Sequence, residues 1–84
     1  MKHATAETIA RIKPLLDRIR SFGELNEKKP GIYYYKGSAF LHFHEDGDQL
    51  YADVKLEPPK FERLPVSTSA QQDKLIELIR GKTG

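Results

Sequence analysis

The chain has 84 residues, of which 38% are hydrophobic and 31% charged, and 14 Lys and Arg against 12 Asp and Glu leave a formal net charge of +2. This length predicts one domain, and the mixed composition excludes a wholly disordered chain and a membrane-spanning segment. Cysteine is absent, which excludes a disulfide framework, a thiol nucleophile and thiolate metal ligands. We expect a single soluble domain, ordered over about residues 6–80 with flexible termini. The first residues lack the apolar stretch of a secretory signal, so we expect a cytoplasmic protein.

The first predicted element is a helix over residues 6–22. Apolar side chains recur there at steps of three and four residues, at Ile9, Ile12, Leu16 and Ile19. Pro14 interrupts the backbone hydrogen bonding of such a helix. Because the apolar period continues through Pro14, we expect one helix that is kinked there and ends near Gly23, in preference to a helix that begins near Lys13.

A polar connector over residues 24–31 precedes three segments with alternating apolar and polar side chains, which predict strands over residues 32–36, 38–45 and 49–56. Asp46-Gly47 between the last two is a strong hairpin signal, and Lys36-Gly37 is a weaker one. Residues 61–66 are expected to add a fourth strand, which Pro65 would confine to an edge of the sheet.

The last predicted element is a helix that begins near Ser69. Ser69 and Gln72 have the spacing of a capping box, and an apolar stripe of Leu75, Ile76 and Ile79 leads to Gly81. The order α-β-β-β-(β)-α predicts an α+β fold of two layers. In this fold an antiparallel meander of three or four strands has both helices packed on one face.

The hairpin register predicts which side chains share a face of this sheet. With Asp46-Gly47 at the centre of the turn, Phe43 lies opposite Leu50 and His42 opposite Tyr51. One face is then apolar and packs against the helices; it holds Ile32, Tyr34, Ala39, Leu41, Phe43, Leu50, Ala52, Val54 and Leu56. The opposite face, which we call the Tyr/His face, holds Tyr33, Tyr35, Phe40, His42, His44, Tyr51 and Asp53. Since a solvated face usually carries Lys, Glu and Thr, this face is the candidate functional surface, provided that the last helix does not cover it as a second core layer.

Two hypotheses for this face stand out. Contiguous exposed aromatic side chains usually mark interaction sites, so the first is a small binding domain that uses the Tyr/His face for a protein partner or a second copy, as in a homodimer. The second is a zinc or iron site, because His42 and His44 lie on the same side of one strand with Asp53 within reach on the next. Glu45 points to the other face and is excluded as a ligand, and His3 is expected to be uninvolved in a flexible terminus.

Other functions are less well supported. Single-stranded nucleic acid stacks on aromatic sheets, but residues 32–56 carry two lysines against four acidic residues, whereas a phosphate backbone requires a positive surface. An acid–base enzyme based on His42 and Asp53 is disfavoured because no nucleophile or phosphate-loop motif accompanies them. We therefore predict no catalytic residue, no cofactor besides the alternative metal ion, and no membrane contact.

Residues 40–46 read Phe-Leu-His-Phe-His-Glu-Asp, and residues 51–54 read Tyr-Ala-Asp-Val, followed by Phe-Glu-Arg at residues 61–63. This set of motifs resembles a family of small bacterial proteins that has no assigned activity, and the resemblance covers residues 31–80. It implies a bacterial, cytoplasmic α+β domain and carries over no site residue.

Overall fold

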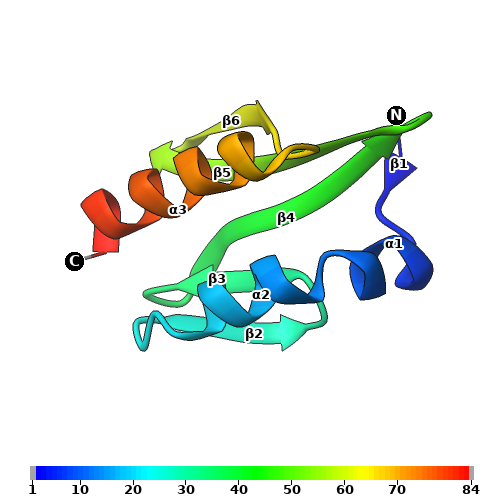
Figure 1. Cartoon of the computed structure of the whole chain (residues 1–84). Coiled ribbons are helices and arrows are strands. Elements are labelled where there is room, and N and C mark those ends of the chain that lie inside the picture. Colours follow the sequence, from blue (N-terminus) through cyan, green and yellow to red (C-terminus); the bar gives the residue numbers. More distant parts are fainter. Residues whose placement is uncertain (1, 84) are drawn as a thin grey trace.

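The computed structural model describes residues 2–83, and it shows an antiparallel sheet with helices packed on one of its faces (Figure 1). Its elements are β1 (Lys2–His3), α1 (Ala6–Arg11), α2 (Lys13–Arg20), β2 (Leu25–Lys29), β3 (Ile32–Tyr35), β4 (Ser38–Asp46), β5 (Gln49–Glu57), β6 (Lys60–Pro65) and α3 (Ser69–Thr83). The strand order is β2-β3-β4-β5-β6, with β1 paired to β4. Both α2 and α3 lie on the same side of the sheet, α2 beside β2 and α3 beside β5 and β6. The predicted α+β meander with helices on one face is thus confirmed.

The predicted single kinked helix is wrong, because the chain forms two helices separated at Ile12. Pro14 stands in the first turn of α2, where its missing N–H would have had no intrahelical partner. The Thr5 side chain caps α1 by accepting a hydrogen bond from the Thr8 backbone N–H. α2 ends at Arg20, before the predicted stop at Gly23. Proline therefore marks the start of the second helix.

The polar connector and the last helix differ from their predicted forms, whereas the predicted fourth strand is present at an edge of the sheet. The polar connector contains β2, an edge strand whose charged side chains protect it from pairing with another chain. The predicted fourth strand is β6, and it lies at the opposite edge of the sheet. The capping box falls one residue earlier than predicted, since Thr68 and Gln71 exchange side-chain-to-backbone hydrogen bonds. α3 then continues past Gly81 to Thr83.

The hairpin register differs from the predicted one by two residues. Asp46 pairs with Gln49, so Gly47 and Asp48 form the turn, and His42 lies opposite Asp53. Only the first of the two turn residues has a positive φ, +61° at Gly47. This is the pattern of a type II′ turn, whereas an Asp-Gly pair at the centre of a hairpin favours type I′. Because a shift of two residues preserves the alternation of side chains, the division of β4 and β5 into two faces remains as predicted.

The core lies between the sheet and the two longer helices. α2 contributes Leu15, Leu16 and Ile19, α3 contributes Leu75, Ile76 and Ile79, and the sheet contributes Leu41, Phe43, Ala52 and Val54. Tyr33 also belongs to this core and is 1% exposed, so its predicted place on the Tyr/His face is wrong. The reason is an irregularity between Tyr33 and Tyr34, which pairs Tyr33 with Leu41 on the core side of β4.

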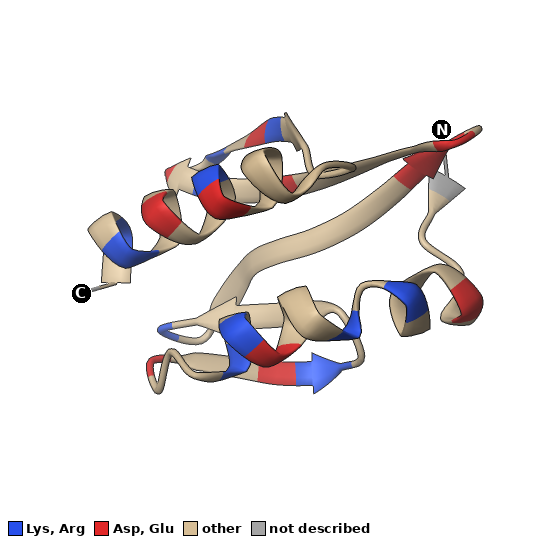
Figure 2. Ribbon diagram, viewed as in Figure 1, with Lys and Arg blue, Asp and Glu red and all other residues tan. Residues whose placement is uncertain are grey.

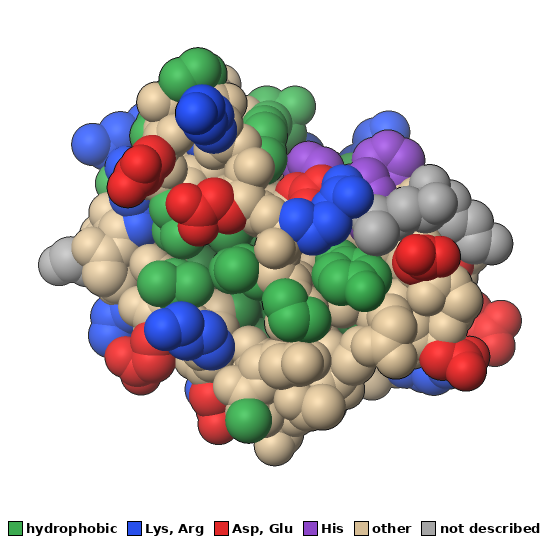
Figure 3. Space-filling model, turned by 90° about the horizontal axis from the view of Figure 1, so that it is seen from above, with side chains coloured by type: hydrophobic (Ala, Val, Ile, Leu, Met, Phe, Trp, Pro, Cys, Tyr) green, Lys and Arg blue, Asp and Glu red, His purple; other side chains and the backbone are tan. Residues whose placement is uncertain are grey.

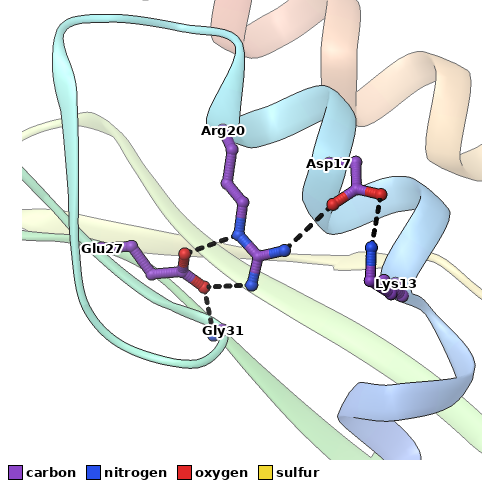
Figure 4. Close-up of polar contacts among 5 residues, drawn as sticks. All are labelled: Lys13, Asp17, Arg20, Glu27 and Gly31. Atoms are coloured by element: carbon purple, nitrogen blue, oxygen red, sulfur yellow. Dashed lines mark hydrogen bonds and ion pairs between the residues drawn. The ribbon is translucent and has the colours of Figure 1, made fainter.

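A chain of polar contacts ties α2 to the β2–β3 hairpin (Figure 4). Both carboxylate oxygens of Glu27 accept hydrogen bonds from Arg20, at 2.6 Å from Nε and 3.0 Å from Nη2. One of them also accepts from the backbone N–H of Gly31 at 3.1 Å. The Arg20 guanidinium is the main cause of the lowered pKa of Glu27. The buried Tyr33 side chain lies opposite Glu27, and burial, followed by the Glu27 charge, raises the pKa of its hydroxyl.

Gly31 provides a stability test. Its φ is +81°, and an added Cβ would lie 2.7 Å from Cδ1 of Ile9. The substitution Gly31→Ala is expected to lower the free energy of unfolding by about 1–2 kcal/mol, because an L residue is strained in the left-handed region. Urea unfolding measures this change. The matched control is Gly23→Ala, since an added Cβ at Gly23 meets no atom within 4 Å; equal losses in both variants would contradict the assignment.

The contact between Glu27 and Arg20 makes stability depend on acid pH. The unfolded chain has an ordinary glutamate pKa of 4.5, whereas the folded value is lower. As pH falls below 4.5 the unfolded state takes up the proton first, so the free energy of unfolding decreases through the folded pKa. In Glu27→Gln this part of the acid profile should be absent, with a loss of about 1 kcal/mol at neutral pH.

Chemical unfolding between pH 3 and pH 7 checks this expectation. Glu77→Gln is the control, because the ion pair of Glu77 with Arg80 is exposed on α3 and is expected to contribute only a few tenths of a kcal/mol. An acid profile for Glu27→Gln that superimposes on that of the unsubstituted chain would show that Arg20 does not hold this carboxylate in solution.

Candidate metal centre

The structure brings His42, His44 and Asp53 together on the face of the sheet opposite the helices. His44 lies between the other two: its Nε2 is 3.0 Å from Nδ1 of His42 and 3.0 Å from Oδ2 of Asp53. The alternation of β4 places both histidines on the same face, and the register places Asp53 directly opposite His42. All three residues of the sequence-predicted metal set therefore lie within reach of one another.

Asp53 is held from its other side by β6. Arg63, the cross-strand partner of Asp53, donates from Nε to Oδ1 at 2.8 Å and from Nη2 to Oδ2 at 2.9 Å. This bidentate contact is the largest cause of the lowered pKa of the buried Asp53 carboxyl group. The carboxylate consequently stays ionised and fixed in orientation beside Nε2 of His44.

The third histidine of the chain, His3, joins this group, and the prediction that it is uninvolved is wrong. β1 pairs with β4 so that His3 lies opposite His44, and the Ala4 N–H donates to the Phe43 carbonyl at 3.1 Å. The His3 ring centroid lies 4.6 Å from that of His44 and 6.0 Å from that of His42. One ligand nitrogen from each ring can be chosen such that all lie within 4.8 Å of one another. Figure 3 shows the histidines grouped on the surface with acidic and basic side chains beside them.

The electrostatic environment favours the neutral imidazole of His42. Burial is the main cause of its lowered pKa, and His44, His3 and Arg63 add to the effect, whereas the Asp53 charge opposes it. Neutral imidazole is the form that ligates a metal ion. A tetrahedral zinc ion with bonds of about 2.0–2.1 Å to nitrogen needs ligand atoms about 3.3 Å apart. One nitrogen from each of His3, His42 and His44 lies within 4.8 Å of the others, so small side-chain rotations would bring the three to this spacing.

The remaining residues of the predicted Tyr/His face lie outside this group. Phe40 is 2% exposed and packs against Tyr35, whose ring centroid is 5.4 Å away. Tyr51 lies opposite His44 and is half-buried. Phe61 was not predicted to lie on this face, because its strand was expected only to add an edge to the sheet. Its side chain is 40% exposed, and its ring lies 5.1 Å from that of His42. Partner binding and homodimer formation remain predictions.

Two expectations about the surroundings of the centre are resolved. Glu45, excluded as a ligand from sequence, accepts a hydrogen bond from Thr8 in α1. α3 packs on the opposite face, so the last helix does not form a second core layer over the histidines. Within residues 2–83, no helix is long and apolar enough to cross a membrane.

Comparisons with protein-family models, with curated proteins and with solved structures give no match. The similarity to small bacterial proteins therefore stays a prediction, and the function is inferred from the geometry of the site.

Proposed function

We propose that this protein binds a divalent transition-metal ion, with Zn²⁺ preferred, through His3, His42 and His44. The observation that carries the proposal is convergence: the chain has three histidines, one of them distant in sequence from the other two, and the fold gathers all three with ligand atoms within 4.8 Å. Imidazole nitrogen is a preferred ligand of zinc, and three protein ligands are the set of a zinc site that keeps one position open.

The Asp53 carboxylate favours zinc over iron. A non-haem iron site with two histidines and one carboxylate would need an Asp53 oxygen as a ligand. Both oxygens of Asp53 accept hydrogen bonds from Arg63, and the carboxylate also contacts His44. Asp53 is thus better suited to orient His44 than to bind the ion, and because its Oδ2 lies beside Nε2 of His44, this ring would bind the ion through Nδ1. Carboxylates that hold a ligating histidine in this way are common in zinc proteins.

Access to the ion follows from the burial of its ligands. His42 and His44 are half-buried, whereas His3 is exposed. With three imidazoles bound, the fourth position would face solvent on the His3 side and hold water or a small ligand. The proposal is therefore an accessible metal centre and not a closed structural site.

Titration with Zn²⁺ tests the centre. Protein produced without a histidine tag is expected to bind one equivalent of zinc at neutral pH, measured by calorimetry and by metal analysis after gel filtration. His42→Ala and His44→Ala should each lower the affinity at least about 100-fold, because a site with two imidazoles lacks the minimum ligand set. His3→Ala should also lose affinity, by about tenfold or more, since His3 is the exposed member of the set.

The control is Asp48→Asn, which removes one charge from the acidic β4–β5 turn and leaves the histidines intact. It should bind zinc as the unsubstituted chain does. No stoichiometric binding by the unsubstituted chain, or binding that survives the loss of both His42 and His44, would refute the metal centre.

The role of Asp53 gives a separate prediction. Asp53→Asn keeps the shape of the side chain but removes the charge that His44 and Arg63 contact. Zinc affinity should fall about 10- to 100-fold, the usual effect of losing a residue that supports a ligand, while the stoichiometry remains one. A loss as complete as that in His42→Ala would instead make Asp53 a direct ligand, and an unchanged affinity would separate it from the centre.

A further inference from the structure

A second candidate site lies at the end of β4 away from the acidic hairpin turn. It is a pocket of about 280 Å³ lined by Tyr35, Lys36, Ser38, Phe40, Lys55, Pro58 and Lys82. These residues come from the end of β3, the β3–β4 turn and the start of β4, from β5 and the turn that follows it, and from the last turn of α3. Figure 2 shows basic residues on both the β3–β4 turn and the end of α3 at this side of the molecule. The pocket shares no lining residue with the three histidines.

The polar part of the lining is strongly cationic. Lys36, Lys55 and Lys82 line the pocket, and no carboxylate side chain is among the described residues that line it. Within the part of the chain that the structure describes, none of these lysines forms an ion pair. The Lys55 ammonium donates to the Ser38 hydroxyl at 3.3 Å. Three lysines around one small space, with no ion pair among the described residues, create a positive potential that favours an anion.

The apolar part of the lining comes from Tyr35, Phe40 and Pro58. The rings of Tyr35 and Phe40 are 5.4 Å apart, and Tyr35 is the more accessible of the two because Phe40 is only 2% exposed. The Lys36 ammonium lies over the Tyr35 ring at 5.3 Å, so its charge is held at the aromatic wall. An anion that fits this pocket has a negatively charged group that contacts the lysines and a compact apolar group that contacts the aromatic side chains.

We infer that this pocket binds a small phosphate monoester whose organic part is a flat ring. A phosphate monoester carries about −1.5 to −2 charges at pH 7 and three acceptor oxygens, which suits three lysines better than a single carboxylate would. The pocket, at about 280 Å³, is just below the usual range of about 300–1,000 Å³ for ligand sites. One ring and one phosphate group fit such a space, whereas a dinucleotide or a nucleic-acid strand is too large for it.

Titration with phenyl phosphate, followed by amide and side-chain NMR shifts, tests the inference. EDTA is included so that no metal ion at the histidines binds the phosphate. Phenyl phosphate is expected to shift signals of Ser38, Phe40 and Lys55 with a dissociation constant below about 1 mM, and inorganic phosphate should bind about tenfold more weakly because it lacks the ring. Phenol alone should produce no saturable shift.

Two variants and a control sharpen the result. Lys55→Gln and Lys82→Gln should each weaken binding about tenfold, the usual effect of losing a charged hydrogen-bond donor. The control is Lys28→Gln, because Lys28 also lies over a tyrosine ring, at 5.7 Å from that of Tyr34, but does not line the pocket. Lys82 is near the end of α3, so its variant keeps the test valid if Lys55→Gln unfolds. No saturable shift with phenyl phosphate, or equal weakening in Lys28→Gln, would overturn the inference without affecting the zinc result.

Discussion

The pairing of β4 with β5 is the constraint on which the rest of this structure depends. Every second residue of these two strands faces the helices and forms the core, and the residues between them face the other way. The same pairing that buries Leu41 against Val54 sets His42 opposite Asp53. A shift of one residue in one strand would turn its core side chains to the opposite face of the sheet and expose them. Core packing therefore holds the candidate metal centre in register.

The β4–β5 turn explains why the observed register differs from the predicted one while the same side chains still share a face. Asp46-Gly47 has the composition of a type I′ turn, but Gly47 takes the first turn position, and Asp46 pairs within the strand. The resulting shift of two residues changes every cross-strand partner and preserves both faces. His42, His44 and Asp53 were therefore predictable as a group from alternation alone. Their contacts were not, because contacts depend on which residue lies opposite which.

Other parts of the site were beyond sequence pattern for identifiable reasons. β1 has two residues, too few for any periodicity, so nothing marked His3 as part of the sheet. Arg63 lies on an edge strand that consists mostly of exposed residues, and its pairing with Asp53 depends on the β5–β6 register. Tyr33 moved from the predicted surface into the core because the β3–β4 pairing contains an irregularity, which alternation cannot anticipate. The positions of the strands could be predicted from the local sequence pattern, whereas the pairing of residues from distant segments could not.

The two candidate sites lie at different ends of β4, and the charges around them favour ions of opposite sign. Beside the histidines the Asp53 carboxylate is paired with Arg63, so the centre presents imidazole nitrogens that suit a cation. At the other end of β4, Lys36 lies over the Tyr35 ring and Lys55 over the Phe61 ring. The described residues that line the pocket there include no carboxylate side chain, so that end suits an anion. Because β1 supplies His3 and is held to β4 by only a short pairing, a metal ion bound there would also fasten the first strand to the sheet. Binding of the ion to the folded state alone would then stabilise the fold in proportion to its free concentration, so stability and metal occupancy would be linked through this face of the sheet.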